Sequence, residues 1–198
     1  MPATRTTTRL LDALHDRANE PVWIHMDARY RGVIAGLAKR LGLDDADADD
    51  VAQQTLAEFI RCYRQGKYDR TKGRLSSWIL SIAHHTTLGV IRRRQAEGRQ
   101  AQTQIDEHLD EPALRSIWTD ERDRAILGKA LSMLREESEI DERTLLAFEL
   151  SSLRGVPVTE AASQCGMTPD QVYVARSRVT RKLRALVDEL TAAFEEDA

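Results

Sequence analysis

A run of basic side chains near the end of the chain has the chemistry to bind the phosphates of a nucleic acid. Between Gln171 and Arg184 the local charge is +5, with five basic residues and no acidic one (Arg176, Arg178, Arg181, Lys182 and Arg184). Guanidinium and ammonium groups neutralise phosphates when several of them lie along one element. A solvated basic face is the plainer interpretation of such a run, so the local structure around it must decide.

The residues before this run predict a helix, a tight turn and a second helix. Gly166 can adopt the left-handed conformation that ends a helix over 159–165. Thr168 and Gln171 have the spacing of a capping box, and Pro169 suits the first helical position. One side of the second helix is apolar at every third or fourth position (Val172, Ala175, Val179, Leu183, Leu186 and Leu190). We therefore expect its opposite, basic side to enter a DNA groove.

The formal net charge of −3 hides a strong segregation of charge along the chain. Residues 41–58 contain six acids and no base, whereas residues 66–99 contain eight bases and two acids, or +6. Segregated charges of this kind predict separate surfaces for separate partners.

Composition indicates a globular helical protein. The 198 residues are 41% hydrophobic, 31% charged and 5% aromatic, and apolar residues recur with helical spacing, so we expect an all-α fold. Cys62 and Cys165 are far apart in the sequence and neither belongs to a cluster of cysteines and histidines. The sequence therefore predicts neither a structural disulfide nor a zinc site. Without a signal peptide pattern or a long apolar run, the sequence predicts a cytoplasmic protein that does not insert into a membrane.

Periodicity organises the first half of the chain into three helices. The first begins near Pro21 and breaks at Gly42, and the second follows a cap at Asp45 or Asp47. The second helix carries a polar stripe opposite its apolar side (Asp50, Gln53 and Gln54). A basic loop over 65–74 leads into the third helix, which ends in three arginines. Tyr68 in that loop is flanked by cations and is well placed to stack on an unpaired base.

These patterns predict two small helical domains joined by a flexible linker. The helical periodicity is lost from Gln95 to Pro112, where glutamines and acidic residues accumulate. A new helical unit is expected to begin after Thr119, which would be its N-cap. The predicted segments are an N-terminal tail (1–20), a first domain (21–94), a linker (95–118), a second domain (119–190) and an acidic tail (191–198).

Two segments resemble motifs of a known family. Asp47–Gln54 (DADDVAQQ) resembles an acidic helix of the form Asp-Ala-Glu-Asp-Leu-Val-Gln-Glu, and Lys72–Ala83 (KGRLSSWILSIA) resembles Gly-x-Phe-x-x-Trp-Leu-x-x-Ile-Ala. Both motifs belong to the second conserved region of bacterial sigma factors of the extracytoplasmic-function (ECF) type. The second half resembles the fourth conserved region with its helix-turn-helix, so the resemblance covers nearly the whole chain.

The resemblance implies a promoter-recognition subunit that is not an enzyme and has no catalytic residue, metal or cofactor. Its partners would be core RNA polymerase and promoter DNA, and the family also admits an anti-sigma protein. In the family the acidic helix docks on the largest polymerase subunit, which assigns core binding to Asp50, Gln53 and Gln54.

For the minus-ten element, the loop around Tyr68 corresponds to the family's specificity loop, which captures a flipped base. Unpairing that base costs a few kcal/mol, which the pocket must offset. The arginines at the end of the third helix would hold phosphates, a contact that positions without specifying sequence. The implied minus-ten contacts are Lys67, Tyr68, Lys72, Arg74, His85, Arg92, Arg93 and Arg94.

The last helix would read the minus-thirty-five element in the major groove. The family often has Ser-Arg where this chain has Val174 and Ala175, so the contacts are chosen from helix geometry instead. They are Thr168, Tyr173, Ser177, Arg178 and Arg181.

A stand-alone transcription regulator is the main alternative. The first half would then be a sensor or dimerisation domain, and only the last helix pair would contact DNA. Such a protein would bind duplex operators without polymerase, and neutralising Asp50 and Gln53 would be harmless.

A metal-dependent enzyme is a third hypothesis, suggested by the adjacent His84 and His85. Successive residues of a helix point in different directions, whereas metal ligands on one helix are usually three or four positions apart. This spacing argues against a metal site.

Overall fold

The computed structural model describes residues 13–14, 20–96, 98, 109–136 and 140–195, and these residues contain helices and turns but no strand. The all-α prediction is confirmed. The chain divides into two compact units, called here unit 1 (Met1–Ala125 with Ala192–Ala198) and unit 2 (Ile126–Thr191). The elements are α2 (Glu20–Arg40), α3 (Asp45–Arg64), η1 (Arg70–Lys72), α4 (Leu75–Ala96), α5 (Glu111–Glu136), α6 (Glu142–Phe148), η2 (Glu149–Leu153), α7 (Val158–Cys165) and α8 (Pro169–Glu195). No helix among the described residues is long and apolar enough to cross a bilayer.

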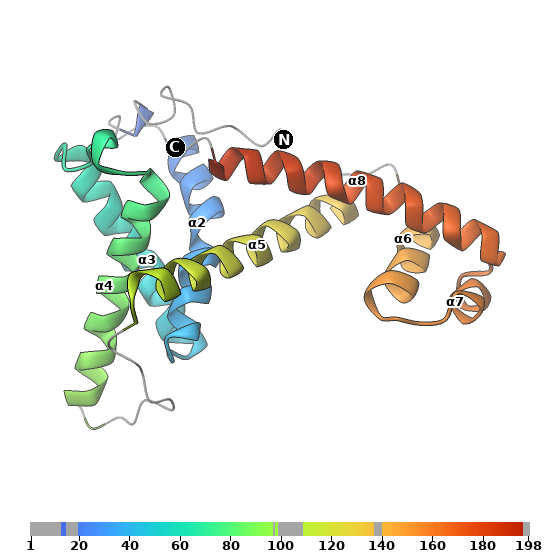
Figure 1. Cartoon of the computed structure of the whole chain (residues 1–198), viewed down its shortest axis with the longest axis horizontal. Helices are drawn as coiled ribbons and strands as arrows, with labels where there is room; N and C mark the ends of the chain where they lie inside the picture. The colour runs from blue at the N-terminus through green and yellow to red at the C-terminus, as the bar shows by residue number, and fades with distance from the viewer. Residues whose placement is uncertain (1–12, 15–19, 97, 99–108, 137–139, 196–198) are drawn as a thin grey trace. The chain divides into compact units, whose positions relative to one another are not determined.

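Unit 1 is built around α2, α3 and α4, which pack against one another (Figure 1). Tyr30, Phe59 and Ile79, one from each helix, are among its fully buried side chains. The side chain of Asp44 caps α3 by accepting a hydrogen bond from the Asp47 amide at 3.0 Å. The expected cap at Asp45 or Asp47 is therefore wrong, because Asp44 is the residue that accepts from the free amides at the start of the helix.

The assignment of residues 1–20 to a tail is wrong for Leu14. Its side chain is fully buried in the core of unit 1, and its carbonyl oxygen accepts a hydrogen bond from Arg64 Nε at 3.4 Å. The polar composition of the first residues concealed the burial of Leu14. Residues 1–12 and 15–19 lie outside the described residues.

Helix α5 begins at Glu111, within the segment expected to be linker, and not at Thr119. The Asp110 carboxylate accepts a hydrogen bond from the Ala113 amide at 2.9 Å, as an N-cap does. Asp110, Glu111 and Pro112 thus form a helix start, which the loss of periodicity before them concealed. Leu114 and Trp118 are buried in the core of unit 1, while residues 97 and 99–108 of the expected linker lie outside the described residues.

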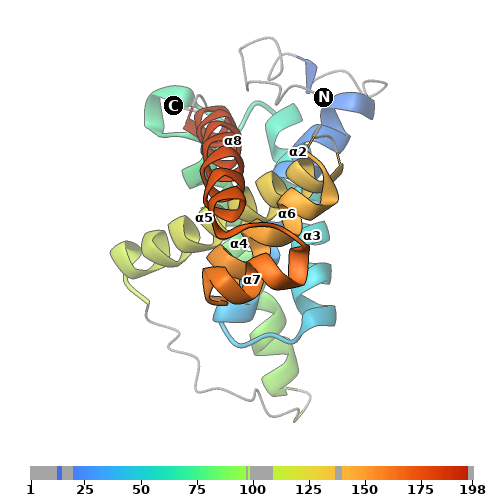
Figure 2. The same cartoon turned by 90° about the vertical axis from the view of Figure 1, so that its right-hand side faces the viewer.

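Unit 2 holds the predicted helix pair, α7 and α8, together with α6 and the short π-helical segment η2 (Figure 2). Gly166 lies between α7 and α8 with φ 61° and ψ 39°, the left-handed conformation expected for it. The Thr168 hydroxyl accepts from the Gln171 amide at 3.2 Å, and the Gln171 side chain accepts from the Thr168 amide at 2.8 Å. This reciprocal pair confirms the capping box.

The buried side of α8 is the predicted one, since Val172, Ala175 and Val179 are all in the cores of unit 2. The helix continues to Glu195, so residues 191–195 are helical and the predicted tail begins too early. No glycine or proline follows Pro169, which explains why nothing ends the helix sooner. Residues 196–198 lie outside the described residues.

Candidate nucleic-acid and protein interfaces

The polar stripe predicted on α3 is exposed as one surface. Asp50, Gln53 and Gln54 are all exposed, whereas Ala48 and Val51 on the opposite side of the helix are fully buried. Residues three and four positions apart lie on the same side of a helix, so the carboxylate and the two amides form a compact patch, called here the α3 stripe. It presents one negative charge and several hydrogen-bonding groups to a partner.

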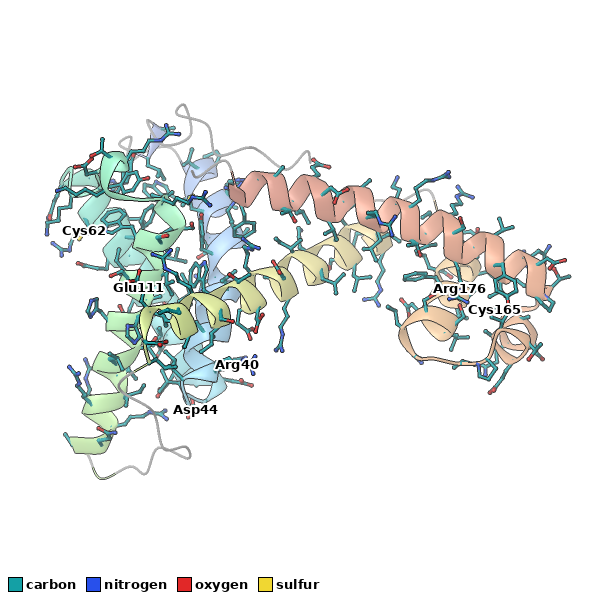
Figure 3. All side chains as sticks on the ribbon, in the orientation of Figure 1. Arg40, Asp44, Cys62, Glu111, Cys165 and Arg176 are labelled. Carbon is teal, nitrogen blue, oxygen red and sulfur yellow. The ribbon has the colours of Figure 1, made fainter. Side chains whose placement is uncertain are left out.

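Unlike the α3 stripe, the acidic residues at the start of α3 form ion pairs with cations of unit 1. Arg94 Nη2 lies 2.9 Å from Asp44 Oδ2, and Arg94 Nε also pairs with Asp47 (Asp44 is labelled in Figure 3). Lys39 Nζ lies 2.9 Å from Asp45. Local cations therefore partly neutralise the acidic segment, and Asp50 keeps its charge for a partner.

The contact between Arg94 and Asp44 also makes the N-terminus of α3 sensitive to pH. The hydrogen bond from the Asp47 amide, and then that from Arg94, lower the pKa of Asp44 below its ordinary 3.8. A depressed folded-state pKa means that the interaction stabilises unit 1 above that ordinary value and is lost as the pH falls through the lowered one.

These contacts distinguish Arg94 from the other two arginines at the end of α4. Arg92 and Arg93 are exposed at the end of α4 and form no ion pair with any residue in the described part of the chain, whereas the side chain of Arg94 is 23% exposed and paired with two acids. The three side chains were expected to act alike. The sequence did not reveal the difference, because Asp44 and Asp47, which pair with Arg94, lie 50 and 47 positions earlier.

The rest of the predicted minus-ten set lies on the loop before α4 and on α4 itself. Lys67, Lys72 and Arg74 are exposed, and Lys72 Nζ lies 3.6 Å from Asp69. His85 is exposed on α4, seven positions before Arg92, so the two lie on the same side of the helix. The structure therefore gathers cations in two places within unit 1, the loop and the exposed side of α4.

Tyr68 is half-buried in an aromatic cluster. Its ring stacks against those of Tyr63 and Trp78, with distances of 6.0 Å and 5.2 Å between the ring centroids. Its hydroxyl donates a hydrogen bond to the Gly73 carbonyl oxygen at 3.3 Å. Phe59 contacts Trp78 edge to face at 5.7 Å. These contacts tie the basic loop to α3 and α4, so Tyr68 orders the loop in addition to any contact with a base.

The exposed side of α8 carries the predicted reading residues of unit 2. Tyr173, Ser177, Arg178 and Arg181 are exposed, and the Arg176 guanidinium lies 5.9 Å from the Tyr173 ring centroid (Arg176 is labelled in Figure 3). The hydroxyl of Thr168 is engaged in the capping box instead. Thr168 therefore orients the start of the helix through its own contacts.

Residues 26–97 match the family described as Sigma-70 region 2, a stretch that includes the α3 stripe, the basic loop and α4. The chain is also 28% identical to the ECF RNA polymerase sigma factor SigE of Mycolicibacterium smegmatis, over 98% of this chain and 71% of that protein. The chain therefore contains a segment of the Sigma-70 region 2 family and is similar to an ECF sigma factor over nearly its whole length. The resemblance noted in the sequence is thereby confirmed.

One exposed residue of α8 is absent from the set predicted from the sequence. Val174 is 67% exposed, the largest exposed fraction among the large hydrophobic side chains of the described residues that are open to solvent. It lies three positions before Ser177 and seven before Arg181, so helix geometry places the three on one side. That spacing was available in the sequence as the signal for Val174.

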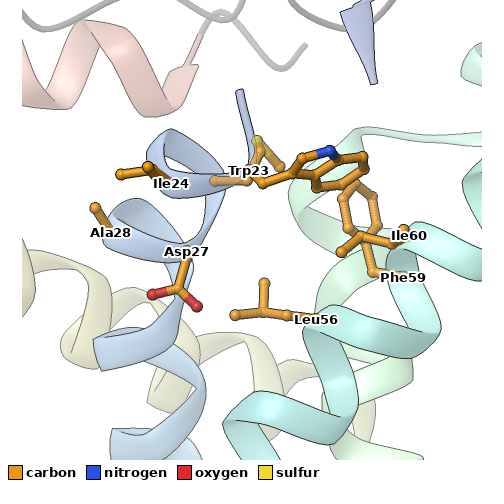
Figure 4. A pocket seen from close by; sticks show the side chains of 8 residues that line it. Trp23, Ile24, Asp27, Ala28, Leu56, Phe59 and Ile60 are labelled. Atoms are coloured by element: carbon orange, nitrogen blue, oxygen red, sulfur yellow. The ribbon is translucent and has the colours of Figure 1, made fainter. Parts of the chain in front are cut away.

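Unit 1 also has an apolar pocket between α2 and α3, shown in Figure 4. Its volume is about 400 Å³, and its lining includes Trp23, Ile24, Leu56 and Ile60 with Asp27 on the α2 side. Ile60 lies on α3 seven positions after Gln53, on the same side, so the pocket adjoins the α3 stripe. A pocket of this kind can accept an apolar side chain.

Neither His84 nor His85 belongs to a group of three or more potential metal ligands among the described residues. The rings of His84 and His85 are 6.1 Å apart. Burial, and then the nearby charge of His85, lower the pKa of His84. Cys62 and Cys165 are buried free thiols.

Proposed function

We propose that this sigma factor directs core RNA polymerase to specific promoters and assists melting of the minus-ten element. Unit 1 would bind polymerase through α3 and the minus-ten region through the basic loop and α4, and unit 2 would read the minus-thirty-five element through α8. The observation that carries this proposal is the separation of charge within unit 1. Asp50 is exposed with the two glutamines of the α3 stripe, while Arg92 and Arg93 are exposed at the far end of another helix.

The proposed polymerase contact rests on the exposure of the α3 stripe. A carboxylate flanked by amides suits a basic and polar protein surface, because the amides can donate and accept hydrogen bonds while the charge steers association. The family match places the stripe within Sigma-70 region 2, which supports this assignment.

The proposed minus-ten contacts are of two kinds. Lys67, Lys72, Arg74 and the exposed arginines of α4 would neutralise phosphates, which positions the DNA without reading its sequence. Tyr68 and His85 carry rings that can stack on a base or donate a hydrogen bond to it.

The arginine triplet provides a prediction with an internal control. Arg92→Ala and Arg93→Ala should each reduce the slope of log affinity against log salt by about 0.7–0.9, because each removes one phosphate contact. Arg94→Ala should leave that slope nearly unchanged and lower the melting temperature of unit 1 instead, since Arg94 is bonded to Asp44. Promoter-binding titrations across a salt series measure the slope, and an equal drop for all three variants would contradict the division.

Tyr68 can be tested by separating its ring from its hydroxyl. Tyr68→Phe keeps the stacking surface and loses the hydroxyl with its bond to Gly73, whereas Tyr68→Ala loses the ring as well. We expect Tyr68→Ala to impair strand opening by about 1–3 kcal/mol if a base stacks there, and Tyr68→Phe to open promoters normally. Permanganate footprints on promoter thymines report the opening, and normal footprints for Tyr68→Ala would exclude the stacking role.

The proposal as a whole is tested by run-off transcription with purified protein and core polymerase. We expect transcripts from a subset of promoters that core polymerase alone does not produce. Polymerase binding without promoter selectivity would contradict the proposal. Tight binding of duplex operators without polymerase would instead favour the stand-alone regulator.

A further inference from the structure

The exposure of Val174 is unusual for its residue type within unit 2. The two nearest valines of α8, Val172 and Val179, are fully buried, whereas Val174 is 67% exposed. A single exposed apolar side chain is common on protein surfaces and by itself indicates nothing. Its position, however, is in the early turns of the second helix of a helix-turn-helix, where base-edge contacts are made.

The surroundings of Val174 on α8 are polar. Ser177 and Arg181 lie on the same side at spacings of three and seven, and Asp170 lies four positions before it. Each of these neighbours can form hydrogen bonds or ion pairs, and Val174 cannot. Valine therefore provides the one purely apolar contact at the centre of this side of the helix.

The chemistry of the major groove narrows what such a contact can recognise. Among the base edges exposed there, the C5-methyl group of thymine is the apolar one, while the others present donors and acceptors. A valine in a helix is held in one side-chain rotamer, so its methyl groups are presented in a defined direction. A buried contact between valine and a hydrogen-bonding base edge would instead leave that edge unpaired.

We propose that Val174 contacts the C5-methyl group of a thymine in the minus-thirty-five element and is a specificity-determining residue of this sigma factor. This proposal rests on the proposed function, because it needs α8 to lie in the major groove. Tyr173 beside it, with Arg176 over its ring, would support the contact from one flank.

Deoxyuridine substitution isolates the contact, because it removes the thymine methyl and keeps every hydrogen-bonding group of the base. The experiment uses a promoter that the full-length protein transcribes with core polymerase, with its minus-thirty-five thymines replaced one at a time. The holoenzyme should bind about three- to fivefold more weakly at one of these positions, as expected for one buried methyl group. The Val174→Ala holoenzyme should bind the unmodified promoter more weakly and be insensitive to deoxyuridine at that position.

Leu153→Ala is the matched control, because Leu153 is an apolar side chain of unit 2 that is 51% exposed and lies outside α8. It should retain the wild-type sensitivity to deoxyuridine. Equal deoxyuridine effects in the wild type and in Val174→Ala, or no effect at any thymine, would overturn the proposal for Val174. Failure to obtain promoter-specific transcripts at all would instead overturn the proposed function, so the two failures are distinguishable.

Discussion

Replacement of Asp50 by arginine should weaken association with core RNA polymerase by about a hundredfold or more. Asp50 is exposed in the α3 stripe and has no ion pair with any residue in the described ranges, so its charge is available to a partner. Reversing a charge within a complementary interface replaces an attraction by a repulsion worth several kcal/mol, and about 3 kcal/mol already corresponds to the stated factor. Fluorescence titration of labelled protein with core polymerase measures the affinity.

Asp188→Arg is the charge-matched control for this prediction. Asp188 is exposed on α8 in unit 2 and is not part of the α3 stripe, so its replacement changes the net charge by the same amount and leaves the stripe intact. We expect near wild-type polymerase affinity for the control. Similar losses for both variants would show that net charge, and not the α3 stripe, governs association. An unchanged affinity for Asp50→Arg would remove the stripe from the interface.

Replacement of Phe59 by alanine should destabilise unit 1 by about 3–5 kcal/mol. Phe59 is fully buried, and its ring contacts Tyr63 at 5.9 Å and Trp78 at 5.7 Å. Removing the ring loses its transfer free energy and leaves a cavity among the other aromatic rings. Because the contact partners include the cluster that holds Tyr68, the same change should also disorder the basic loop.

Tryptophan fluorescence is a selective measurement for this effect. All three tryptophans of the chain, Trp23, Trp78 and Trp118, belong to unit 1, so denaturant titration followed by their emission reports on that unit. Tyr68→Ala provides the comparison within the same cluster. Its side chain is only half-buried, and we expect a clearly smaller loss. A loss below about 1 kcal/mol for Phe59→Ala would mean that its ring is not part of a packed core.

Local signals explain the predictions that succeeded. The capping box of Thr168 and Gln171 and the left-handed Gly166 depend on residues within a few positions of one another, so composition and spacing were sufficient. The α3 stripe was likewise predicted from helical periodicity alone.

The predictions that failed have two different causes, one a local signal that was misread and the other a contact between residues far apart in the sequence. The start of α5 was placed too late, because the acids of Asp110 and Glu111 resemble a linker unless they are recognised as a cap and a first turn. Leu14 was assigned to a tail because no residue near it in the sequence shows that it bonds to Arg64 and packs in the core of unit 1.

The sequence by itself determined the all-α fold, the capping box before α8, the charge segregation and the family resemblance, since each of these depends on short-range spacing or on motifs. Only the tertiary structure decided which charges remain available. It paired Arg94 with Asp44 and Asp47, packed the ring of Tyr68 against Tyr63 and Trp78, and left Val174 exposed on α8. The physical reason is that burial and ion pairing depend on residues brought together by packing, and separation along the chain does not record that proximity.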